Sequence, residues 1–524
     1  MTQITRRQLI ALAGASASSL WLARSLRAQT RFDANPFTLG VASGSPTHDS
    51  VVLWTRLALT GFFGSRLGQA PITVRWEVAH DEGFTRPVQS GQAQALHELG
   101  HSVHVEVPNL DPDRWYWYRF MAGDAVSPIG RTRTFPSPDA APGSLRLAYA
   151  SCQRWEHGYY SAYRHLREEN PDVVLFLGDY IYEYPGAGNA VRLPSGGWVT
   201  TLDDYRQRYA LHKSDPDLLA AHAACPWLVT WDDHEVQNDY AGLQAGENGP
   251  AVADFGARRA AAYQAWYEHM PVRASVLARA LSGPAGAQAP RIHGQTRFGR
   301  LATLTLLDDR QYRDPLVCTR GGKPGSSRVD PTACTVWEDP QRTLLGRAQE
   351  AWLDDAFARA GPGWNIVGQQ TLFGRRDFRP GPGESFWNDG WDGYPAARRR
   401  FTDSLRRHSV ANAVLFGGDL HENWVGHVKA DYADATSPAI GVEFCGTSIT
   451  SRAAPDSQSA QWLAENPHFV FADTRQRGYG IAHFTAQRLT TTLRVIDDPT
   501  SREARVSTLA TFTVAAGQPR IEQG

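Results

Sequence analysis

Residues 36–137 show the short, regularly spaced apolar runs of a domain built only from strands. Examples are "SVVLWTRL", "ITVRWEVAH", "SVHVEV", "WYWYRF" and "IGRTRTFP", each bounded by turn-forming residues. Such spacing is typical of β-sandwiches. We therefore predict an N-terminal all-β domain of the fibronectin/Ig-like kind over residues 36–137, followed by the Pro-rich linker "PSPDAAPGS" at 136–144.

The pattern changes after this linker. A strand-like run at 145–150 is followed by helical periodicity at 158–169 and by a second strand-like run at 172–177. This order predicts a βαβ unit and a sheet that is at least partly parallel. Further strands are expected at 227–231, 301–307, 365–368 and 413–417, long helices at 252–269 and 345–360, and late antiparallel strands within 480–497. The second domain is thus α/β and spans 145–510.

Polar residues that can bind a metal follow each predicted core strand. The segments are "SCQ" (151–153), "GDYIY" (178–182), "DDHE" (232–235), "DDR" (308–310), "QQ" (369–370) and "GDLHEN" (418–423). Ligands of α/β sheets bind beyond the carboxyl ends of the strands. Any one segment could be a capped turn, but six at the same topological position predict one shared site.

The residue types in these segments favour metal binding. Many acids in one pocket repel one another and resist ionisation unless cations are present. Oxygen-rich ligation with few histidines favours hard ions. Asp179 and Tyr182 are three residues apart, so a turn after the strand would direct both side chains to one place.

The first 28 residues have the pattern of an export signal, not of a folded element. Arg6 and Arg7 precede an apolar run from Leu9 to Ala23, and Ala28 is a plausible cleavage position. The arginine pair resembles a twin-arginine signal. The alternatives are a Sec signal or an N-terminal anchor, although the apolar run is short and interrupted for a membrane span. We expect a periplasmic or secreted protein that uses the twin-arginine export machinery, without a span after processing.

Composition narrows the classes of partner. Hydrophobic residues make up 42% and charged residues 20% of 524 residues, as in a globular protein with a large core. The formal net charge of −1 gives no basis for nucleic-acid binding through a basic surface. We expect a monomer that acts on a small or polymeric substrate.

Five cysteines are present in a chain that is expected to be exported. Cys318 and Cys334 bracket a loop rich in Gly, Pro and Ser, and in an oxidising compartment they are the natural disulfide. Cys225 and Cys445 lie beside apolar strand-like runs and are expected to be buried. Outside the Cys318–Cys334 pair three cysteines remain, Cys152, Cys225 and Cys445, so at least one of them cannot pair within the chain. Cys152 follows a predicted core strand directly.

Several motifs together resemble the PhoD-type alkaline phosphatases, a branch of the calcineurin-like metallophosphoesterase superfamily. They are "SCQ", "GDYIYEY", "WDDHE", "LLDDRQYRD", "WNIVGQQ", "DGWDGY" and "FGGDLHENWVGHV", and the resemblance spans roughly residues 36–510. It implies a four-layer αββα metallophosphoesterase sandwich for the catalytic domain.

The resemblance also assigns roles to single residues. Cys152 stands where the wider superfamily has Asp-x-His. Asp179 corresponds to a carboxylate that bridges two metals, and Tyr182 to a tyrosinate ligand shared with purple acid phosphatases. Asp233 and His234 stand where the superfamily has Asn and His.

The last superfamily motif, Gly-His-x-His, corresponds to a segment that contains Asp419 and His421. Gln369 and Gln370 occupy the place of a histidine usually found before it, so any ligand there is open. The resemblance implies two cofactors, Fe³⁺ and Ca²⁺. Fe³⁺ would be held by Cys152, Asp179, Tyr182 and His421, and Ca²⁺ by Asp179, Asp233 and Asp419.

A metal-bound hydroxide would then attack phosphorus in line. His234 is the candidate general acid or phosphate contact, and Arg154 is the candidate bidentate phosphate ligand. Arg310 is a weaker phosphate candidate, with a structural salt bridge as its alternative. Asp232 is expected to orient ligands from outside the first coordination shell. The loop at 386–401 either closes over the site or is a packed surface loop.

These observations predict an exported phosphatase that hydrolyses phosphomonoesters and phosphodiesters. One alternative is a phosphodiesterase with phospholipase D-like activity that prefers diesters, since the ligand set suits both. A more distant alternative is an exported protein that binds a surface polymer and carries a vestigial metal site.

Overall fold

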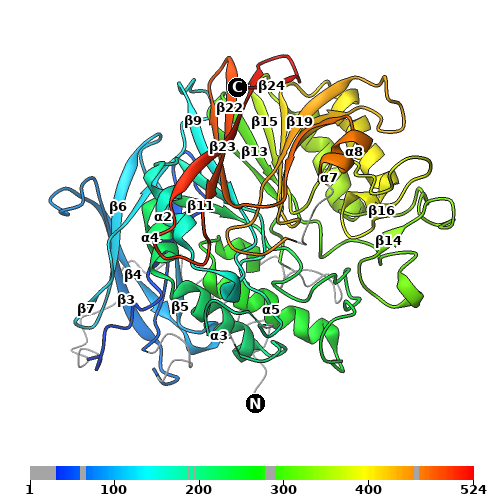
Figure 1. Ribbon diagram of the computed structural model, residues 1–524. Coiled ribbons are helices and arrows are strands. Elements are labelled where there is room, and N and C mark those ends of the chain that lie inside the picture. Colours follow the sequence, from blue (N-terminus) through cyan, green and yellow to red (C-terminus); the bar gives the residue numbers. More distant parts are fainter. Residues whose placement is uncertain (1–30, 60–66, 187–188, 194–195, 278–289, 454–458) are drawn as a thin grey trace.

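The computed structural model describes residues 31–59, 67–186, 189–193, 196–277, 290–453 and 459–524, so the predicted signal at 1–28 lies outside them. The fold is mixed α/β. Within the described residues two large sheets face each other, and a smaller sheet lies to one side, as Figure 1 shows. Among these residues no helix combines the length and the apolar character that a membrane crossing requires.

The larger sheet has ten strands and combines distant parts of the chain. In spatial order they are β24 (Ile521–Gln523), β23 (Val506–Ala515), β22 (Arg488–Ile496), β21 (Arg477–Phe484), β9 (Leu145–Ala150), β10 (Val173–Phe176), β11 (Pro226–Val229), β1 (Val41–Gly44), β2 (Val51–Arg56) and β5 (Ser102–Val107). Its central strands β9, β10 and β11 are parallel and fully or nearly fully buried. Continuous apolar runs are typical of parallel strands that are covered on both faces.

The second sheet has seven strands. They are β12 (Gly294–Phe298), β13 (Ala302–Leu306), β15 (Trp364–Gly368), β17 (Ala413–Gly417), β19 (Ala439–Cys445), β18 (Asn423–Lys429) and β20 (Phe469–Asp473). Strands β13, β15, β17 and β19 are parallel to one another, so their carboxyl ends share one edge. A short ribbon pairs β14 (Arg328–Val329) with β16 (Phe386–Trp387).

The core lies between the two large sheets. Side chains of β9 and β10, such as Leu147 and Leu175, pack there with Ile366, Val414 and Phe444 of the opposite sheet. The outer face of the ten-stranded sheet is covered by α2 (Ser161–Glu168), α3 (Leu202–Lys213), α4 (Pro216–Ala224) and α5 (Phe255–His269). The outer face of the seven-stranded sheet is covered by α7 (Arg347–Ala358) and α8 (Pro395–Arg407). The short helix α9 (Ser459–Glu465) precedes β20.

Local sequence explains where these helices begin. Thr201 and Asp204 form a reciprocal capping box at α3, and Asp215 caps α4, which has Pro216 at its first position. Asp254 accepts a hydrogen bond from the backbone N–H of Ala257 and starts α5. Of these three helices only α5 was predicted, over 252–269, and it begins at Phe255, whereas α3 and α4 were not predicted.

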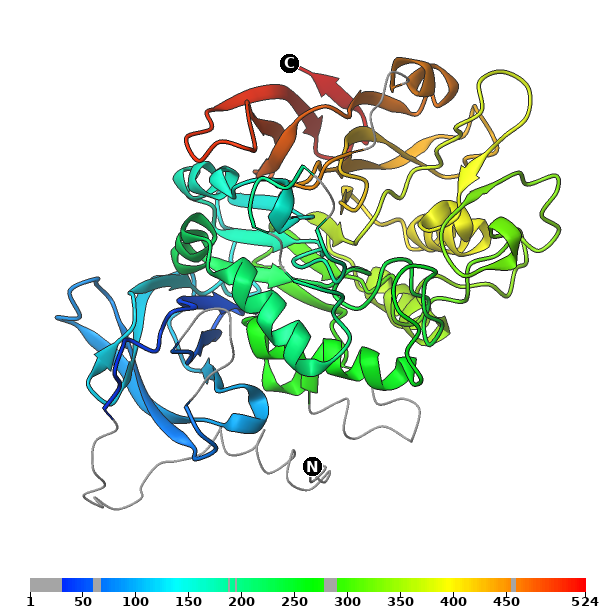
Figure 2. The ribbon, with the colours of Figure 1, turned by 60° about the horizontal axis from the view of Figure 1, so that its bottom comes forward.

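The N-terminal region consists of strands, as predicted, but they divide between two sheets. One is a separate sheet of β4 (Pro87–Ala95), β3 (Ile72–Ala79), β6 (Trp115–Ala122), β7 (Ala125–Val126) and β8 (Gly130–Arg133). The others, β1, β2 and β5, extend the ten-stranded sheet through parallel pairing of β1 with β11. A common core, in which Val51 and Val105 pack with Val74 and Tyr118, joins the two sets of strands. Figure 2 shows this region beside the main body.

Candidate active site

The candidate site lies where the carboxyl ends of the two parallel strand sets meet. Backbone and amide hydrogen bonds connect the segments that follow these strands. The N–H of Cys152 donates to the Gly178 carbonyl at 3.1 Å, and the N–H of Gly418 donates to the Gln370 carbonyl at 2.8 Å. The side chain of Gln370 also donates to the carbonyl of Trp231, which ties one sheet to the other at 2.9 Å. The N–H of Asp309 donates to Gln370 Oε1 and the N–H of Asp179 donates to Glu235 Oε2, both at 3.1 Å, so all six predicted strand-end segments are connected.

Cys152, Asp179 and His421 form the first cluster. Their ligand atoms all lie within 4.8 Å of one another. The hydroxyl of Tyr182 donates to Asp179 Oδ2 at 2.9 Å and lies 3.1 Å from His421 Nε2. His421 Nδ1 is 2.9 Å from the carbonyl of Arg452, which can only accept, so Nδ1 carries the proton and Nε2 keeps its lone pair. The four residues predicted to hold Fe³⁺ thus lie together.

Asp179 also belongs to a cluster of carboxylates. Oxygens of Asp179, Asp232, Asp233 and Asp419 lie within 4.8 Å of one another. Asp179 Oδ1, Asp232 Oδ2 and Asp233 Oδ1 are buried and have no hydrogen-bond partner within the described chain. Unpartnered buried carboxylate oxygens are costly, and metal binding satisfies them. The donor set therefore fits hard cations, with Asp179 shared between two positions.

Burial acts on the acid–base properties of these groups. It raises the pKa of Asp179 and Asp232 well above the usual range and that of Asp419 to about 7. Burial likewise raises the pKa of the Cys152 thiol and the Tyr182 phenol, and neighbouring carboxylates add to the shift. Groups that resist ionisation on their own become ligands when a cation is present.

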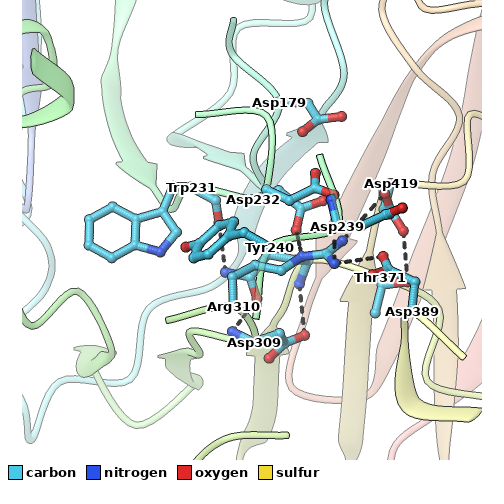
Figure 3. A network of polar contacts seen from close by, with 12 residues as sticks. Asp179, Trp231, Asp232, Asp239, Tyr240, Asp309, Arg310, Thr371, Asp389 and Asp419 are labelled. Carbon is cyan, nitrogen blue, oxygen red and sulfur yellow. Dashed lines mark hydrogen bonds and ion pairs between the residues drawn. The ribbon is translucent and has the colours of Figure 1, made fainter. Parts of the chain in front are cut away.

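Arg310 lies at the centre of the acidic residues, as Figure 3 shows. It is 1% exposed, its Nε bonds Asp232 Oδ1, and Nη1 bonds Asp389 Oδ2 at 2.6 Å. Asp233 and Asp419 lie at 3.8 and 3.5 Å from its guanidinium nitrogens. Arg310 is therefore a counter-ion for these carboxylates, as the salt-bridge alternative expected. Its buried Nη2 has no hydrogen-bond partner among the described residues, so a contact with phosphate stays a prediction.

His234 and Arg154, the predicted catalytic residues, flank the clusters. His234 Nδ1 lies 2.7 Å from Glu183 Oε2, and His234 groups with Asp179 and Asp233. Burial lowers the pKa of His234, but the surrounding acidic groups outweigh it and raise the pKa well above the usual value. The Arg154 guanidinium lies 4.4 Å from the ring centre of Tyr184 and 3.7 Å from Glu156. Its Nη2 also donates to the Pro185 carbonyl at 3.4 Å, and the guanidinium lies 5.7 Å from the ring centre of Tyr182, which places Arg154 beside the site.

Unusual backbone geometry presents the ligands. Cys152, Asp179, Asp419 and His421 all have positive φ, from 56° to 66°. This region is sparsely populated by residues other than glycine and is enriched at functional sites. Gly178 has φ of 104°, and a Cβ there would lie 2.4 Å from Asp232 Cβ. The loop therefore requires glycine directly before Asp179.

Glu235 fixes the orientation of two ligand loops. The side chain is fully buried, and Oε2 accepts hydrogen bonds from the N–H groups of Asp179 at 3.1 Å and Asp232 at 2.8 Å. Oε1 accepts from the N–H of Tyr180 at 2.6 Å. One carboxylate thus holds the segments after β10 and β11 in register.

Sequence reasoning missed two acids of the site. Asp233, Asp239 and Asp389 form a third cluster. Burial raises the pKa of Asp239 to about 6, whereas Arg310 and Arg313 outweigh burial and lower that of Asp389 to about 2. Asp389 comes from the 386–401 loop, which therefore reaches the site. The only signal in the sequence was the Gly- and Asp-rich "NDGWDGY".

The predicted disulfide between Cys318 and Cys334 is present, with a Cα–Cα distance of 5.9 Å. Its loop contacts the site, because the N–H and hydroxyl of Ser326 both donate to Asp239 Oδ2 at 2.8 Å. Cys225 and Cys445 are buried free thiols, as predicted.

Comparison with known proteins identifies the family. The model described as PhoD-like phosphatase matches residues 147–493, and the model described as PhoD-like phosphatase, N-terminal domain, matches residues 22–136. The chain belongs to the PhoD-like phosphatase family. Alkaline phosphatase D of Bacillus subtilis (strain 168) is 42% identical over 507 residues, which is 95% of this chain and 84% of that protein. A solved structure described as "Structure of PhoD" has a TM-score of 0.88 and 41% identity, and the match covers 94% of this chain and 93% of that one.

This PhoD-like phosphatase is accordingly an enzyme, an alkaline phosphatase D-type hydrolase of phosphoric esters. The alternative of a non-catalytic binding protein is set aside. The predicted family is confirmed, and with it the phosphate-ester class of substrate.

Proposed function

We propose that this phosphatase is exported, depends on Fe³⁺ and Ca²⁺, and hydrolyses both phosphomonoesters and phosphodiesters. The observation that carries this proposal is the position of Asp179, whose carboxylate belongs both to the cluster with Cys152 and His421 and to the cluster with Asp233 and Asp419. A shared carboxylate between a thiolate-containing set and an oxygen-only set suits two unlike ions.

Cys152, Asp179, Tyr182 and His421 would hold Fe³⁺, and Asp179, Asp233 and Asp419 would hold Ca²⁺. When bound, the two ions supply Lewis-acid activation of water and neutralise charge on the phosphoryl oxygens. The chain fixes the ligand atoms in advance, because the loops are held by Glu235 and by the Tyr182–Asp179 hydrogen bond.

His234 provides the proton for the leaving oxygen in this proposal. Glu183 accepts from Nδ1 and leaves the Nε2 proton of the charged ring available, and acidic neighbours keep that ring protonated. Arg154 binds nonbridging oxygens with its guanidinium, since its nearest carboxylate, Glu156, is 3.7 Å away.

The finer features of the fold follow from the same proposal. We assign the packed helices and sheets to a four-layer metallophosphoesterase sandwich at 145–510, and strands within 36–137 to a fibronectin/Ig-like domain. Export through the twin-arginine route is supported by Arg6 and Arg7. Replacing both by lysine should keep the protein in the cytoplasm, and undiminished export would refute that route.

Two buried thiols provide the test of the metal site. We expect Cys152→Ala to lose iron, visible absorbance from tyrosinate–Fe³⁺ and hydrolysis, whereas the matched Cys225→Ala variant keeps all three. Metal analysis, absorbance and activity on paired monoester and diester substrates are measured on protein exported by its own host. Retention of iron in Cys152→Ala would refute the ligand set. A strong preference for diesters would favour the phosphodiesterase alternative.

A further inference from the structure

A groove of about 420 Å³ is lined by Arg452 and Arg477, both of which hydrogen-bond with His421. Its walls come from the segment after β19, the turn before β21 and the loop after β22. The lining residues are His157, Thr450, Arg452, Ala453, Thr474, Arg475, Gln476, Arg477, Ile496, Asp497, Pro499 and Thr500. No role has so far been given to this groove.

Among the described residues, the groove has more arginines than carboxylates that pair with them. Arg475 is neutralised by Asp473 at 3.0 Å, and Asp497 is neutralised by Arg505 at 2.9 Å. Within the described ranges of the chain, no carboxylate forms an ion pair with Arg452 or Arg477. The two remaining guanidinium groups therefore give the groove a net positive potential.

The two arginines differ in what they offer a ligand. Arg477 is 6% exposed and donates to backbone carbonyls, including that of Thr474 at 2.7 Å, so it supplies charge. Arg452 is exposed, and its Nη2 donates to the Asn189 carbonyl at 2.9 Å. As far as the described part of the chain goes, its other guanidinium N–H groups can donate to an anion. Burial, together with Arg154 and Arg452, lowers the pKa of His157 to about 4, so the ring is neutral. His157 Nδ1 accepts from the N–H of Arg452 at 3.0 Å, so Nε2 carries the proton and can donate to an anion.

The groove is coupled to the site through His421. The Arg452 carbonyl accepts from His421 Nδ1, and the Arg477 guanidinium donates to the His421 carbonyl. Ser451, the neighbour of Arg452, donates to the Tyr182 hydroxyl at 2.7 Å. The groove wall at Arg452 therefore contacts the proposed iron ligand His421 directly, and its neighbour Ser451 contacts the proposed ligand Tyr182.

We propose that this groove binds a second phosphate group carried by the substrate, with Arg452 as the residue that contacts it. The proposal rests on the proposed function, because it extends the same site. Phosphate is favoured as the ligand because the planar guanidinium fork matches its oxygens and two positive charges match its charge.

The experiment compares alkanediol bisphosphates of increasing chain length with alkyl monophosphates of the same lengths. In the wild type we expect kcat/KM for the bisphosphate to exceed that for the monophosphate by about tenfold at the best length, as for one charge-assisted contact. In Arg452→Gln this ratio should fall towards one. The variant should fold, because the side chain is exposed and the contact to His421 uses the backbone carbonyl. Arg488→Gln, at the opposite end of β22, is the matched control and should keep the wild-type ratio.

A wild-type ratio near one at every length, or an unchanged ratio in Arg452→Gln, overturns the proposal. Free inorganic phosphate is the other source of the same chemistry. Inorganic phosphate could change monophosphate turnover noncompetitively in the wild type but not in Arg452→Gln. If the bisphosphate-to-monophosphate ratio of kcat/KM then stays near one, the groove binds free phosphate and the substrate proposal is also overturned. If neither ester is hydrolysed, the proposed function fails, and calorimetric affinity for the bisphosphate in both proteins then decides the role of the groove.

Discussion

Glu235→Gln tests whether one buried carboxylate positions the ligand loops. The three backbone N–H groups of Asp179, Tyr180 and Asp232 all donate to Glu235, at 2.6 to 3.1 Å. An amide keeps one accepting oxygen and directs an NH₂ group at an N–H donor, so at least one buried donor loses its partner. An unsatisfied buried donor costs about 1–3 kcal/mol, and loss of charge assistance adds to it, so we expect unfolding free energy to fall by about 2–4 kcal/mol.

The assay is denaturant unfolding at about pH 9, because burial raises the pKa of Glu235 to about 7 and the carboxylate must be ionised. Metal content and activity per folded molecule are measured in parallel, and both should fall. Glu443→Gln is the matched control, since Glu443 is equally buried and accepts from the N–H groups of Phe373 and Gly374, outside the metal-ligand clusters. It should lose stability but keep its metals. Unchanged unfolding and metal content in Glu235→Gln would refute the positioning role.

Three further changes test other parts of the structure. Burial lowers the pKa of Lys213 to about 7 in the folded protein, whereas an unfolded lysine has a pKa of about 10.4. Between these two pH values the Lys213 amine is protonated in the unfolded chain and neutral in the folded one. Stability should therefore rise with pH by up to about 1.4 kcal/mol per unit, and denaturation series should show no such rise in Lys213→Met. Cys318→Ser should lower unfolding free energy by about 3 kcal/mol and raise the thiol count by one; an unchanged count would contradict the disulfide. Arg310→Met should cost about 3–5 kcal/mol, more in chelator-treated than in metal-loaded protein, and equal losses would argue against its role as counter-ion.

The strands that carry the site could be predicted because they are buried on both faces. The run at 145–150 coincides with β9, and the run at 172–177 contains β10. Strands β1 and β4 were missed because "VASG" and "PVQSGQAQA" contain small and polar residues with little apolar alternation. Their pairing is decided by the neighbouring strands β2, β11 and β3, which local sequence does not reveal.

The site could be predicted where ligands directly follow a strand. Asp179 and Asp233 are fixed by the end of a strand, so their convergence follows from sheet topology. Asp239 and Asp389 reach the same place on long irregular segments, whose course depends on tertiary contacts such as that of Ser326. For Arg310 the sequence left a phosphate contact and a structural salt bridge open, because the two look the same in sequence, and the structure shows the salt bridges.

The pairing of β1 with β11 has a consequence for how the chain folds. Ser43 and Gly44 pair with Pro226 and Trp227. During synthesis β1 is therefore made well before the strand with which it pairs. The first strands therefore cannot complete their sheet as an independent unit, and the non-local pairing makes folding slow. A fragment that ends at the 136–144 linker would expose the edge of β1 to other chains, and we expect it to aggregate.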